Sequence, residues 1–263
     1  VFVGGSQGTG TQLQVYSQTL TKQTLSNGID SIRNASASVT YSGRIFFTHG
    51  YEGGTIVNNV STYDEYLTKK EVDPLVNRVA DLAGASAEGY ALFAGGFIRG
   101  GRASKMVEAY ESTYTKINVS ELRDGVAELT GSSLGQYAIF AGGKDPNKAN
   151  NYASSFSNQV VSYDRSLTQK FLSNLGVARQ QLTSASVNDH VFFSTGFCYS
   201  GGPNMDISEY IDVYDINLTK VSTIKAKRGV RGAAGASVGD YVLFAGGQID
   251  SGQEWDDVYV YTA

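Results

Sequence analysis

The sequence is poor in cysteine, histidine, proline and tryptophan, and it has no surplus of basic residues. Its 263 residues include one cysteine, two histidines, three prolines and one tryptophan. The single cysteine, Cys198, excludes an internal disulfide and leaves the redox compartment open. No stretch approaches the roughly 20 apolar residues that a membrane-spanning helix needs. The 21 basic and 25 acidic residues give a net charge of −4, which argues against a nucleic acid or an anionic membrane as partner.

Glycine and tyrosine, by contrast, are abundant, with 31 and 17 residues. With so few prolines, this composition is typical of many short strands joined by tight turns, and it fits helices poorly. The length allows one large domain or two ordinary ones, with a substantial core. The chain begins at Val1 without a methionine and shows no signal-peptide pattern, which is consistent with a processed or excised segment.

A short apolar run that ends in glycine recurs six times along the chain. Its copies read VFVGG, RIFFTHG, YALFAGG, YAIFAGG, HVFFSTG and YVLFAGG, and they close at Gly5, Gly50, Gly96, Gly143, Gly196 and Gly247. The spacings between these glycines are 45, 46, 47, 53 and 51 residues. A tyrosine landmark follows each run, as in TYDEYLTK (62–69), and an arginine precedes a run of small residues. Three landmarks in a fixed order indicate a repeat architecture.

Each repeat is expected to form four strands. The small-residue run, such as GAAGASVG, predicts a first strand where backbones crowd together, and the apolar run predicts a second strand buried on both faces. Glycines end this strand because they tolerate positive φ or close backbone approach. The third strand ends at the tyrosine, and the turn to the fourth opens in three repeats with Asp64, Asp164 or Asp215, whose carboxylate can bond amides two residues on. Four-stranded units at this period predict a β-propeller.

These residues resemble the kelch repeat family, whose marks are four apolar residues, a double glycine, a spaced tyrosine and an arginine before the next inner strand. The resemblance covers essentially the whole chain and implies an all-β, six-bladed propeller in a single domain, residues 1–263. The repeats lie near 1–43, 44–89, 90–136, 137–189, 190–240 and 241–263. The family's usual tryptophan after the tyrosine is missing, and two glycine pairs are degraded to His49-Gly50 and Thr195-Gly196. The sequence pattern of the repeats is most similar to that of kelch-type proteins of bacteria and phages.

Strand counting predicts an incomplete ring. Six second strands and six third strands are expected, but only five first strands and five fourth strands. The first repeat lacks its inner strand within residues 1–263, and the last repeat lacks its outer one. Unpaired strand edges invite pairing with another segment. We therefore expect flanking sequence of a longer protein, or a neighbouring chain, to complete the propeller.

Few residues point to catalysis. Some kelch propellers are copper radical oxidases, whose site takes two histidines, two tyrosines and a cysteine at one end of the axis. Here His49 stands at the end of one second strand and His190 at the start of another, so we expect them at opposite faces, unable to share a metal. Cys198 has no base near it in sequence and is expected to be an inert loop residue. No cofactor, metal or catalytic set is expected.

Two sets of residues remain as candidates near the axis. The first is a ring of arginines on the links between blades, expected to bond backbone carbonyls and so to be structural. Its members are Arg33, Arg78, Arg123, Arg179 and, in the last repeat, Arg231 or Arg228. The second is Asp81 and Glu128, which align on inner strands of neighbouring blades. Beside an axial channel they could perform acid–base chemistry or simply be solvated.

The binding surface is expected on the loops that follow the glycine pairs. These loops vary in length and content, whereas the loops at the opposite face are short and alike. Variation on a constant scaffold is typical of binding sites, and the Tyr, Ser, Gly and Asn content resembles that of adaptable paratopes. The aromatic anchors expected there are Tyr51, Phe97, Tyr152, Phe156, Tyr199 and Trp255.

The sequence favours a non-catalytic recognition module for a protein or a glycan at a cell or virion surface, extracellular rather than cytoplasmic. Two alternatives stay open: a sugar isomerase or mutarotase, because kelch folds host such activity, and a structural component of a larger assembly such as a phage tail. The channel mouth discriminates between the classes. An enzyme predicts a deep pocket that holds Asp81, Glu128 and arginines, and a binding module predicts a broad face of aromatic, Ser and Asn side chains.

Overall fold

A computed structural model of the chain describes residues 2–3, 13–16, 21–25, 33–52, 54–148, 152–199, 201, 206–249 and 252–263. At 2–3, 13–16, 22–25, 33–34 and 152–153 it describes the backbone alone. Helix is confined, in this part of the chain, to the 3₁₀ turn η1 (Pro146–Lys148) and the single turn α1 (Tyr152–Ser155). Neither helix is long or apolar enough to cross a membrane. The fold is all-β.

Four antiparallel sheets repeat the same order of four strands. They are β5 (Ser38–Tyr41), β6 (Arg44–Thr48), β9 (Val60–Tyr63) and β10 (Lys69–Val72); β12 (Ala83–Ala87), β13 (Tyr90–Ala94), β16 (Val107–Tyr110) and β17 (Lys116–Asn118); β18 (Thr130–Leu134), β19 (Tyr137–Ala141), β20 (Val160–Tyr163) and β21 (Gln169–Phe171); β23 (Ser184–Val187), β24 (His190–Phe193), β27 (Tyr210–Asp215) and β28 (Lys220–Lys225). The predicted succession of four strands per repeat is confirmed in all four.

The first and last sheets of the chain have three strands each among the described residues. They are β1 (Phe2–Val3), β2 (Leu13–Tyr16) and β3 (Lys22–Leu25); β29 (Ala234–Val238), β30 (Tyr241–Ala245) and β31 (Val258–Thr262). These correspond to the second to fourth strands of one repeat and the first to third strands of another, as the strand count predicted.

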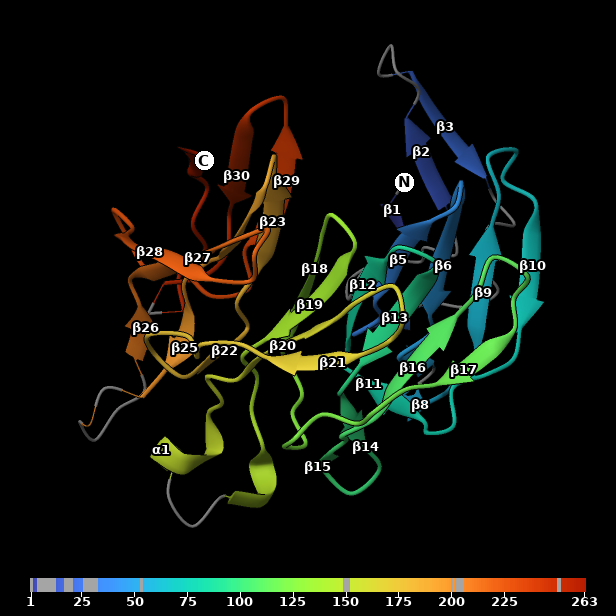
Figure 1. The fold of residues 1–263 in the computed structure, drawn as a ribbon, viewed down its shortest axis with the longest axis horizontal. Coiled ribbons are helices and arrows are strands. Elements are labelled where there is room, and N and C mark those ends of the chain that lie inside the picture. The colour runs from blue at the N-terminus through green and yellow to red at the C-terminus, as the bar shows by residue number, and fades with distance from the viewer. Residues whose placement is uncertain are drawn as a thin grey trace.

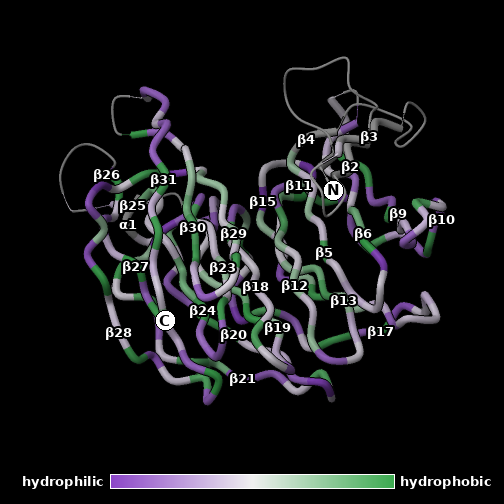
Figure 2. The backbone as a smooth tube through the Cα atoms, turned by 90° about the horizontal axis from the view of Figure 1, so that it is seen from above, coloured by the Kyte–Doolittle hydropathy of each residue, from purple (hydrophilic) through white to green (hydrophobic). Residues whose placement is uncertain are grey.

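The inner strands β5, β12, β18, β23 and β29 pack side by side in chain order, so that consecutive sheets stack face to face. Figure 1 shows the sheets following one another in an arc, from the blue β1–β3 at the upper right to the red β29–β30 at the upper left. In Figure 2 the inner strands lie next to one another in the middle of the molecule. These strands can approach closely because they carry Ala, Gly and Ser; a Cβ on Gly131 would lie 2.6 Å from the Gly84 carbonyl oxygen of the neighbouring sheet.

The core lies between neighbouring sheets, which explains why whole strands read as apolar. All four residues of β9, β16 and β20 are buried. The repeated tyrosine of the third strand packs there, and in the sheets of β16, β20 and β27 its hydroxyl also donates a hydrogen bond. Tyr110 donates to the carbonyl of Asp73, Tyr163 to Ser120 and Tyr214 to Ser173, at 2.6–2.8 Å. Each bond ties the third strand of a sheet to the link that enters the same sheet.

The turns follow the predicted chemistry. Asp64 and Asp164 accept hydrogen bonds from amides two and four residues on, and Asp215 from the amide four residues on, which confirms their role in opening the outer turn. The three glycine pairs that the structure describes adopt positive φ, and Gly96 shows why no side chain is tolerated there. Its φ is 99°, and a Cβ would lie 2.8 Å from the carbonyl oxygen of Ala80.

Beyond the glycine pairs the chain does not form simple loops but a second tier of small sheets. Each contains a link strand and a hairpin: β4 (Arg33–Asn34), β7 (Tyr51–Glu52) and β8 (Thr55–Ile56); β11 (Val79–Ala80), β14 (Phe97–Ile98) and β15 (Arg102–Ala103); β22 (Arg179–Gln180), β25 (Gly196–Cys198) and β26 (Asp206–Ser208). In two other repeats isolated bridges join Ala127 to Lys144 and Arg231 to Gln248 at the matching places. These pairings hold the variable face against the links, and the face lies at the bottom of Figure 1.

Candidate functional site

One residue in each described link has a left-handed backbone just before the inner strand begins. These residues are Ala35, Asp81, Glu128, Gln181 and Gly232, with φ between 53° and 64°. From Asp81 onward, each donates its amide to the carbonyl of the equivalent residue in the preceding repeat, at 2.8–3.0 Å. We call these five residues the axial row. The row is a chain of main-chain hydrogen bonds that runs from sheet to sheet across the inner ends of the links.

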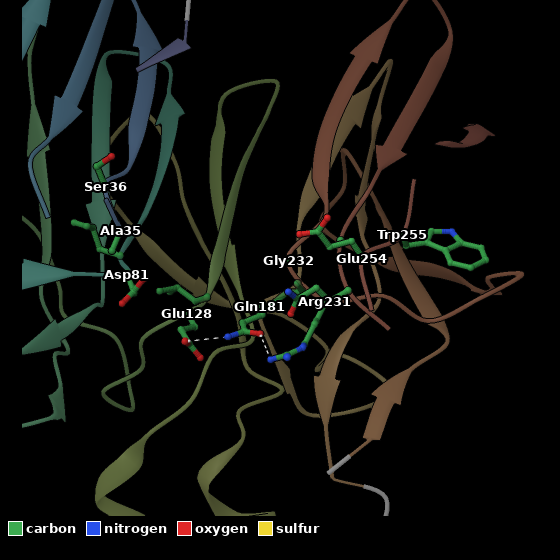
Figure 3. A pocket seen from close by; sticks show the side chains of 14 residues that line it. Ala35, Ser36, Asp81, Glu128, Gln181, Arg231, Gly232, Glu254 and Trp255 are labelled. Carbon is green, nitrogen blue, oxygen red and sulfur yellow. Dashed lines mark hydrogen bonds between the residues drawn. The ribbon is translucent and has the colours of Figure 1, made fainter. Parts of the chain in front are cut away.

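The axial row lines a cavity of about 730 Å³, the axial cavity. Gln248, Glu254 and Trp255 reach it from the loop after the last glycine pair, so the cavity belongs to the variable face. Leucines that directly follow three members of the row complete the apolar part of its wall: Leu82, Leu129 and Leu182. Figure 3 shows side chains from widely separated parts of the chain directed toward this space.

Gln181 connects two charged neighbours within the axial cavity. Its Nε2 donates to Glu128 Oε1 at 3.2 Å, and its Oε1 accepts from Arg231 Nη1 at 3.2 Å. The guanidinium of Arg231 also lies over the ring of Phe197, with Cζ 4.9 Å from the ring centroid. Figure 3 draws both hydrogen bonds. The result is a polar relay from a carboxylate through an amide to a cation, held by three different repeats.

Asp81 stands next to this relay in an environment that disfavours its charge. Burial raises the pKa of the Asp81 carboxyl, and the charge of Glu128 raises it further, to about 6. The sequence alignment had placed these two carboxylates beside one another at the axis, and the structure brings both into one cavity. A group that titrates near neutral pH beside a second carboxylate can accept or donate a proton under physiological conditions.

The five arginines predicted as a structural ring do not all occupy equivalent positions. Counted back from the axial row, Arg33 and Arg179 lie two residues before it, Arg78 three, Arg123 five and Arg231 one. Side chains alternate in direction along an extended backbone, so these different offsets send the guanidinium groups to different places. These arginines therefore differ in their surroundings and do not form a ring of equivalent side chains.

Arg179 is the buried member of the set and has the structural role that was predicted for all. It donates to the carbonyls of Ser194, Val177 and Phe193 and forms an ion pair with Asp212 at 2.9 Å. Arg78 and Arg123 are exposed, and Arg123 pairs with its neighbour Asp124. The alternative in the last repeat, Arg228, lies over the ring of Trp255. The side chain of Arg33 lies outside the described residues.

The predicted aromatic anchors are dispersed rather than gathered on one surface. Tyr51 and Phe97 share a second cavity, and Tyr199 lines a third beside Cys198. Phe156 is only 7% exposed and packs edge-on against Phe197, so its ring supports the loops and is not offered to a ligand. The side chain of Tyr152 lies outside the described residues.

Trp255 borders the axial cavity, but its indole ring points away from it (Figure 3). The indole Nε1 donates to the hydroxyl of Tyr259 at 3.1 Å, and Arg228 covers the ring at 5.0 Å. The carboxylate of Glu254, the preceding residue, points back toward the cavity (Figure 3). The predicted loop thus borders the axial cavity, with Glu254 and not the ring of Trp255 directed toward it.

The histidines and the cysteine lie apart from the axial cavity. His49 follows β6 and His190 begins β24, at opposite ends of equivalent strands. His49 Nε2 is hydrogen-bonded to Ser61 Oγ at 2.7 Å, and Ser61 donates to Glu71, but Ser61 is completely buried and cannot meet a substrate. Cys198 is buried in β25 and is not a loop residue as predicted. Across the described ranges, no three His, Cys, Asp or Glu side chains form a metal-binding group.

Sequence reasoning aligned Gln181 with Asp81 and Glu128 but gave it no functional role, although it connects Glu128 to Arg231. A signal was present: the pairs Asp81-Leu82, Glu128-Leu129 and Gln181-Leu182 repeat a polar residue before a leucine at the same point of each link. The left-handed backbone at these positions was not predicted, because glycine is found there only once, at Gly232.

Sheets that repeat one strand order and meet at their inner strands define a fold of the β-propeller type. The solved structure of YjhT supports this assignment: it superposes with a TM-score of 0.70 over 94% of this chain and 86% of YjhT. The two sequences are 13% identical, so the similarity concerns the fold. By sequence, no protein-family model and no curated protein matches the chain.

Proposed function

We propose that this chain is a recognition module that binds a carbohydrate in the axial cavity. The observation that carries the proposal is the polar relay of Glu128, Gln181 and Arg231, which faces a space of about 730 Å³ on the variable face. Ligand sites are concave and combine apolar walls with a few convergent polar groups. The leucines supply such a wall here, and the carboxylate, amide and guanidinium groups supply acceptors and donors for hydroxyls.

The charges of the lining favour an uncharged ligand in this cavity. Asp81, Glu128 and Glu254 are acidic, and Arg231 is the one basic residue among the lining residues that the structure describes. An anionic group placed among three carboxyl groups would meet charge repulsion. A neutral polyol has no such cost and can use every carboxylate as an acceptor. A neutral sugar unit therefore fits the axial cavity best.

Backbone strain at the axial row supports a functional role for its side chains. Non-glycine residues with left-handed backbone cost of the order of 1 kcal/mol or more each, and they concentrate at functional sites. Glycine would satisfy the same geometry, as Gly232 does, yet Asp81, Glu128 and Gln181 stand at the strained positions. Their side chains give the cavity its chemistry, which the backbone alone does not require.

We extend the proposal to the whole chain. Six blades in a single domain, residues 1–263, account for the four complete sheets and the two sheets with three described strands. A glycan on a cell or virion surface is the partner that suits an extracellular module of this kind. A flanking segment or a neighbouring chain would supply the strands that complete the first and last blades.

A second candidate function, a sugar isomerase or mutarotase, is favoured by Asp81 itself. Its pKa of about 6 and its place beside Glu128 give the cavity a potential acid–base pair. Opening a cyclic sugar needs a proton removed from the anomeric hydroxyl and a proton delivered to the ring oxygen. Anomer interconversion of bound sugars, followed by polarimetry, separates the two functions: a rate equal to that in buffer excludes catalysis, and a rate abolished in Asp81→Asn establishes it.

The recognition function is tested by removing axial side chains without disturbing the backbone. After a glycan array identifies a ligand, Glu128→Gly and Gln181→Gly should lower its affinity at least tenfold in calorimetric titration. Glycine retains the left-handed backbone, so thermal stability should stay the same or rise. The matched control is Ser42→Gly, which changes a residue with φ 51° in the turn between β5 and β6 at the opposite face. Full affinity in both axial variants would refute the site.

A further inference from the structure

A second cavity of about 660 Å³ lies between the hairpins β7–β8 and β14–β15. Its charged lining is basic, whereas that of the axial cavity is mainly acidic. Its walls carry two aromatic rings, from Tyr51 and Phe97, and the aliphatic side chains of Ile56 and Ile98. Both rings are half-buried, so that one part of each stays accessible. We call this space the basic cavity, because of the two further residues that line it.

Arg78 and Arg99 are the charged residues that line the basic cavity, and none of its described lining residues is acidic. Both arginines are exposed, and neither forms an ion pair with another described residue. The other link arginines with described side chains have side-chain partners: Asp212 for Arg179, Gln181 for Arg231, Asp124 for Arg123 and the ring of Trp255 for Arg228. Two guanidinium groups beside aromatic rings suit a planar or tetrahedral anion, since each offers a fork of donors.

The basic cavity and the axial cavity are neighbours across the small sheet of β11, β14 and β15. Phe97, in the wall of the basic cavity, is paired with Ala80, and the next residue is Asp81 of the axial row. The same relation holds in the preceding repeat. There Tyr51 pairs with Asn34, and the residue after Asn34 is Ala35 of the axial row. A ligand of several units that occupies the axial cavity would therefore pass over β11 into the basic cavity.

We propose that the basic cavity binds the anionic group of an acidic saccharide unit, a carboxylate or a sulfate ester. Arg78 and Arg99 hold the anion, and the rings of Tyr51 and Phe97 contact the apolar face of the sugar. The choice of a saccharide rests on the function proposed for the axial cavity, whereas the anion site does not. The two cavities together select a chain in which a neutral unit is joined to an acidic one.

The test compares four probes by isothermal titration calorimetry with the whole chain. They are tetragalacturonate, a sulfated heparin tetrasaccharide, neutral cellotetraose and a hexaglutamate peptide. The variant Arg78→Gln/Arg99→Gln should bind its preferred acidic tetrasaccharide at least tenfold more weakly, and the loss should shrink at high salt because charge attraction is screened. Tetragalacturonate against the heparin fragment distinguishes a carboxylate from a sulfate.

The matched control is Arg102→Gln, an exposed arginine of the same hairpin that does not line the basic cavity. An equal loss in this control, or no preference for either acidic saccharide over cellotetraose, overturns the proposal. Hexaglutamate bound as tightly, with the same dependence on Arg78 and Arg99, overturns the saccharide class in favour of an acidic peptide.

The axial variant Glu128→Gly separates this proposal from the function proposed for the axial cavity. It should lose cellotetraose and still bind monomeric galacturonate, which is added here as a fifth probe. If cellotetraose never binds while galacturonate depends on Arg78, the axial function fails and the anion site stands. If cellotetraose binds in a Glu128-dependent way while galacturonate does not bind, the anion site fails alone.

Discussion

Arg179 and Asp212 form an ion pair of 2.9 Å in which neither side chain is exposed. Asp212 also accepts hydrogen bonds from the amide of Gly176 and the hydroxyl of Thr223, and it forms a second ion pair with Lys220. The pair thus joins the link that enters a sheet to the third and fourth strands of that sheet. A charge buried this deeply is stable only while its partners are present.

Replacement of Arg179 by alanine should destabilise the fold strongly, because it leaves Asp212 buried with Lys220 as its remaining cation. Breaking a buried pair of this kind costs about 3–5 kcal/mol. The free energy of unfolding from urea denaturation measures the effect, and ligand binding should stay nearly intact. The control is Arg123→Ala, whose exposed pair with Asp124 is worth less than about 1 kcal/mol. Similar losses in both variants would contradict the structural role of Arg179.

Stability should fall in acid as Asp212 is protonated. Burial raises the pKa of Asp212, but Arg179 and Lys220 outweigh it and hold the pKa below its ordinary value. A lowered pKa in the folded state stabilises at pH above the unfolded value, about 4, and this contribution is lost as the pH falls through the folded pKa. The difference in unfolding free energy between the wild type and Asp212→Asn should therefore be largest near pH 6 and shrink below about pH 4. A difference that is constant with pH would count against the pair.

Asp81 should show the opposite dependence. Its pKa is raised to about 6, first by burial and then by Glu128, so its ionisation opposes folding. The cost is absent below the unfolded pKa of about 4, grows between about pH 4 and pH 6, and is complete above. Asp81→Asn should be more stable than the wild type at pH 8 and equal to it at pH 3.

The titration of Asp81 can be followed directly by carbon-13 NMR of its carboxyl group. Glu128→Gln should move the midpoint down toward the ordinary aspartate value, because it removes one of the two causes of the shift. A midpoint near 4 in the wild-type protein would show that the carboxyl is solvated and not held in the cavity.

Gly96 and Gly100 separate two reasons for glycine on the variable face. Both have strongly positive φ, 99° and 91°, but a Cβ at Gly96 would lie 2.8 Å from the Ala80 carbonyl oxygen, and at Gly100 nothing lies within 4 Å. Alanine at Gly100 should cost about 1–3 kcal/mol for backbone strain alone. Alanine at Gly96 should cost at least about 1 kcal/mol more, because the clash adds to the strain. Equal melting temperatures for the two variants would rule out the clash.

The sequence predicted the strands well because their signals are local. An apolar run, a glycine that must adopt positive φ and an aspartate that bonds nearby amides each act within a few residues, as Gly96 and Asp64 illustrate. The placement of Asp81 beside Glu128 also followed from the repeat, since equivalent residues of a propeller approach the same axis.

Side-chain direction could not be predicted in the same way. Arg179 and Arg78 differ by one residue in their distance from the axial row, and this difference puts one guanidinium in the core and the other in solvent. The register that decides this is fixed by the small sheets β11–β14–β15 and β22–β25–β26, whose two-residue and three-residue strands leave no periodic pattern in the sequence. The orientation of Trp255 could not be predicted for a related reason, because it depends on contacts with Tyr259 and Arg228.

The hydrogen bonds of the axial row are made by main-chain atoms and are therefore indifferent to which side chain each position carries. An alanine, an aspartate, a glutamate, a glutamine and a glycine already occupy the five places with nearly the same φ. In the axial row the main chain maintains the fold, and the side chains are free to determine which ligand is bound. The five residues could therefore be exchanged, singly or together, to change the ligand of the same fold. A combinatorial library confined to these positions would vary the binding chemistry and leave the fold unchanged.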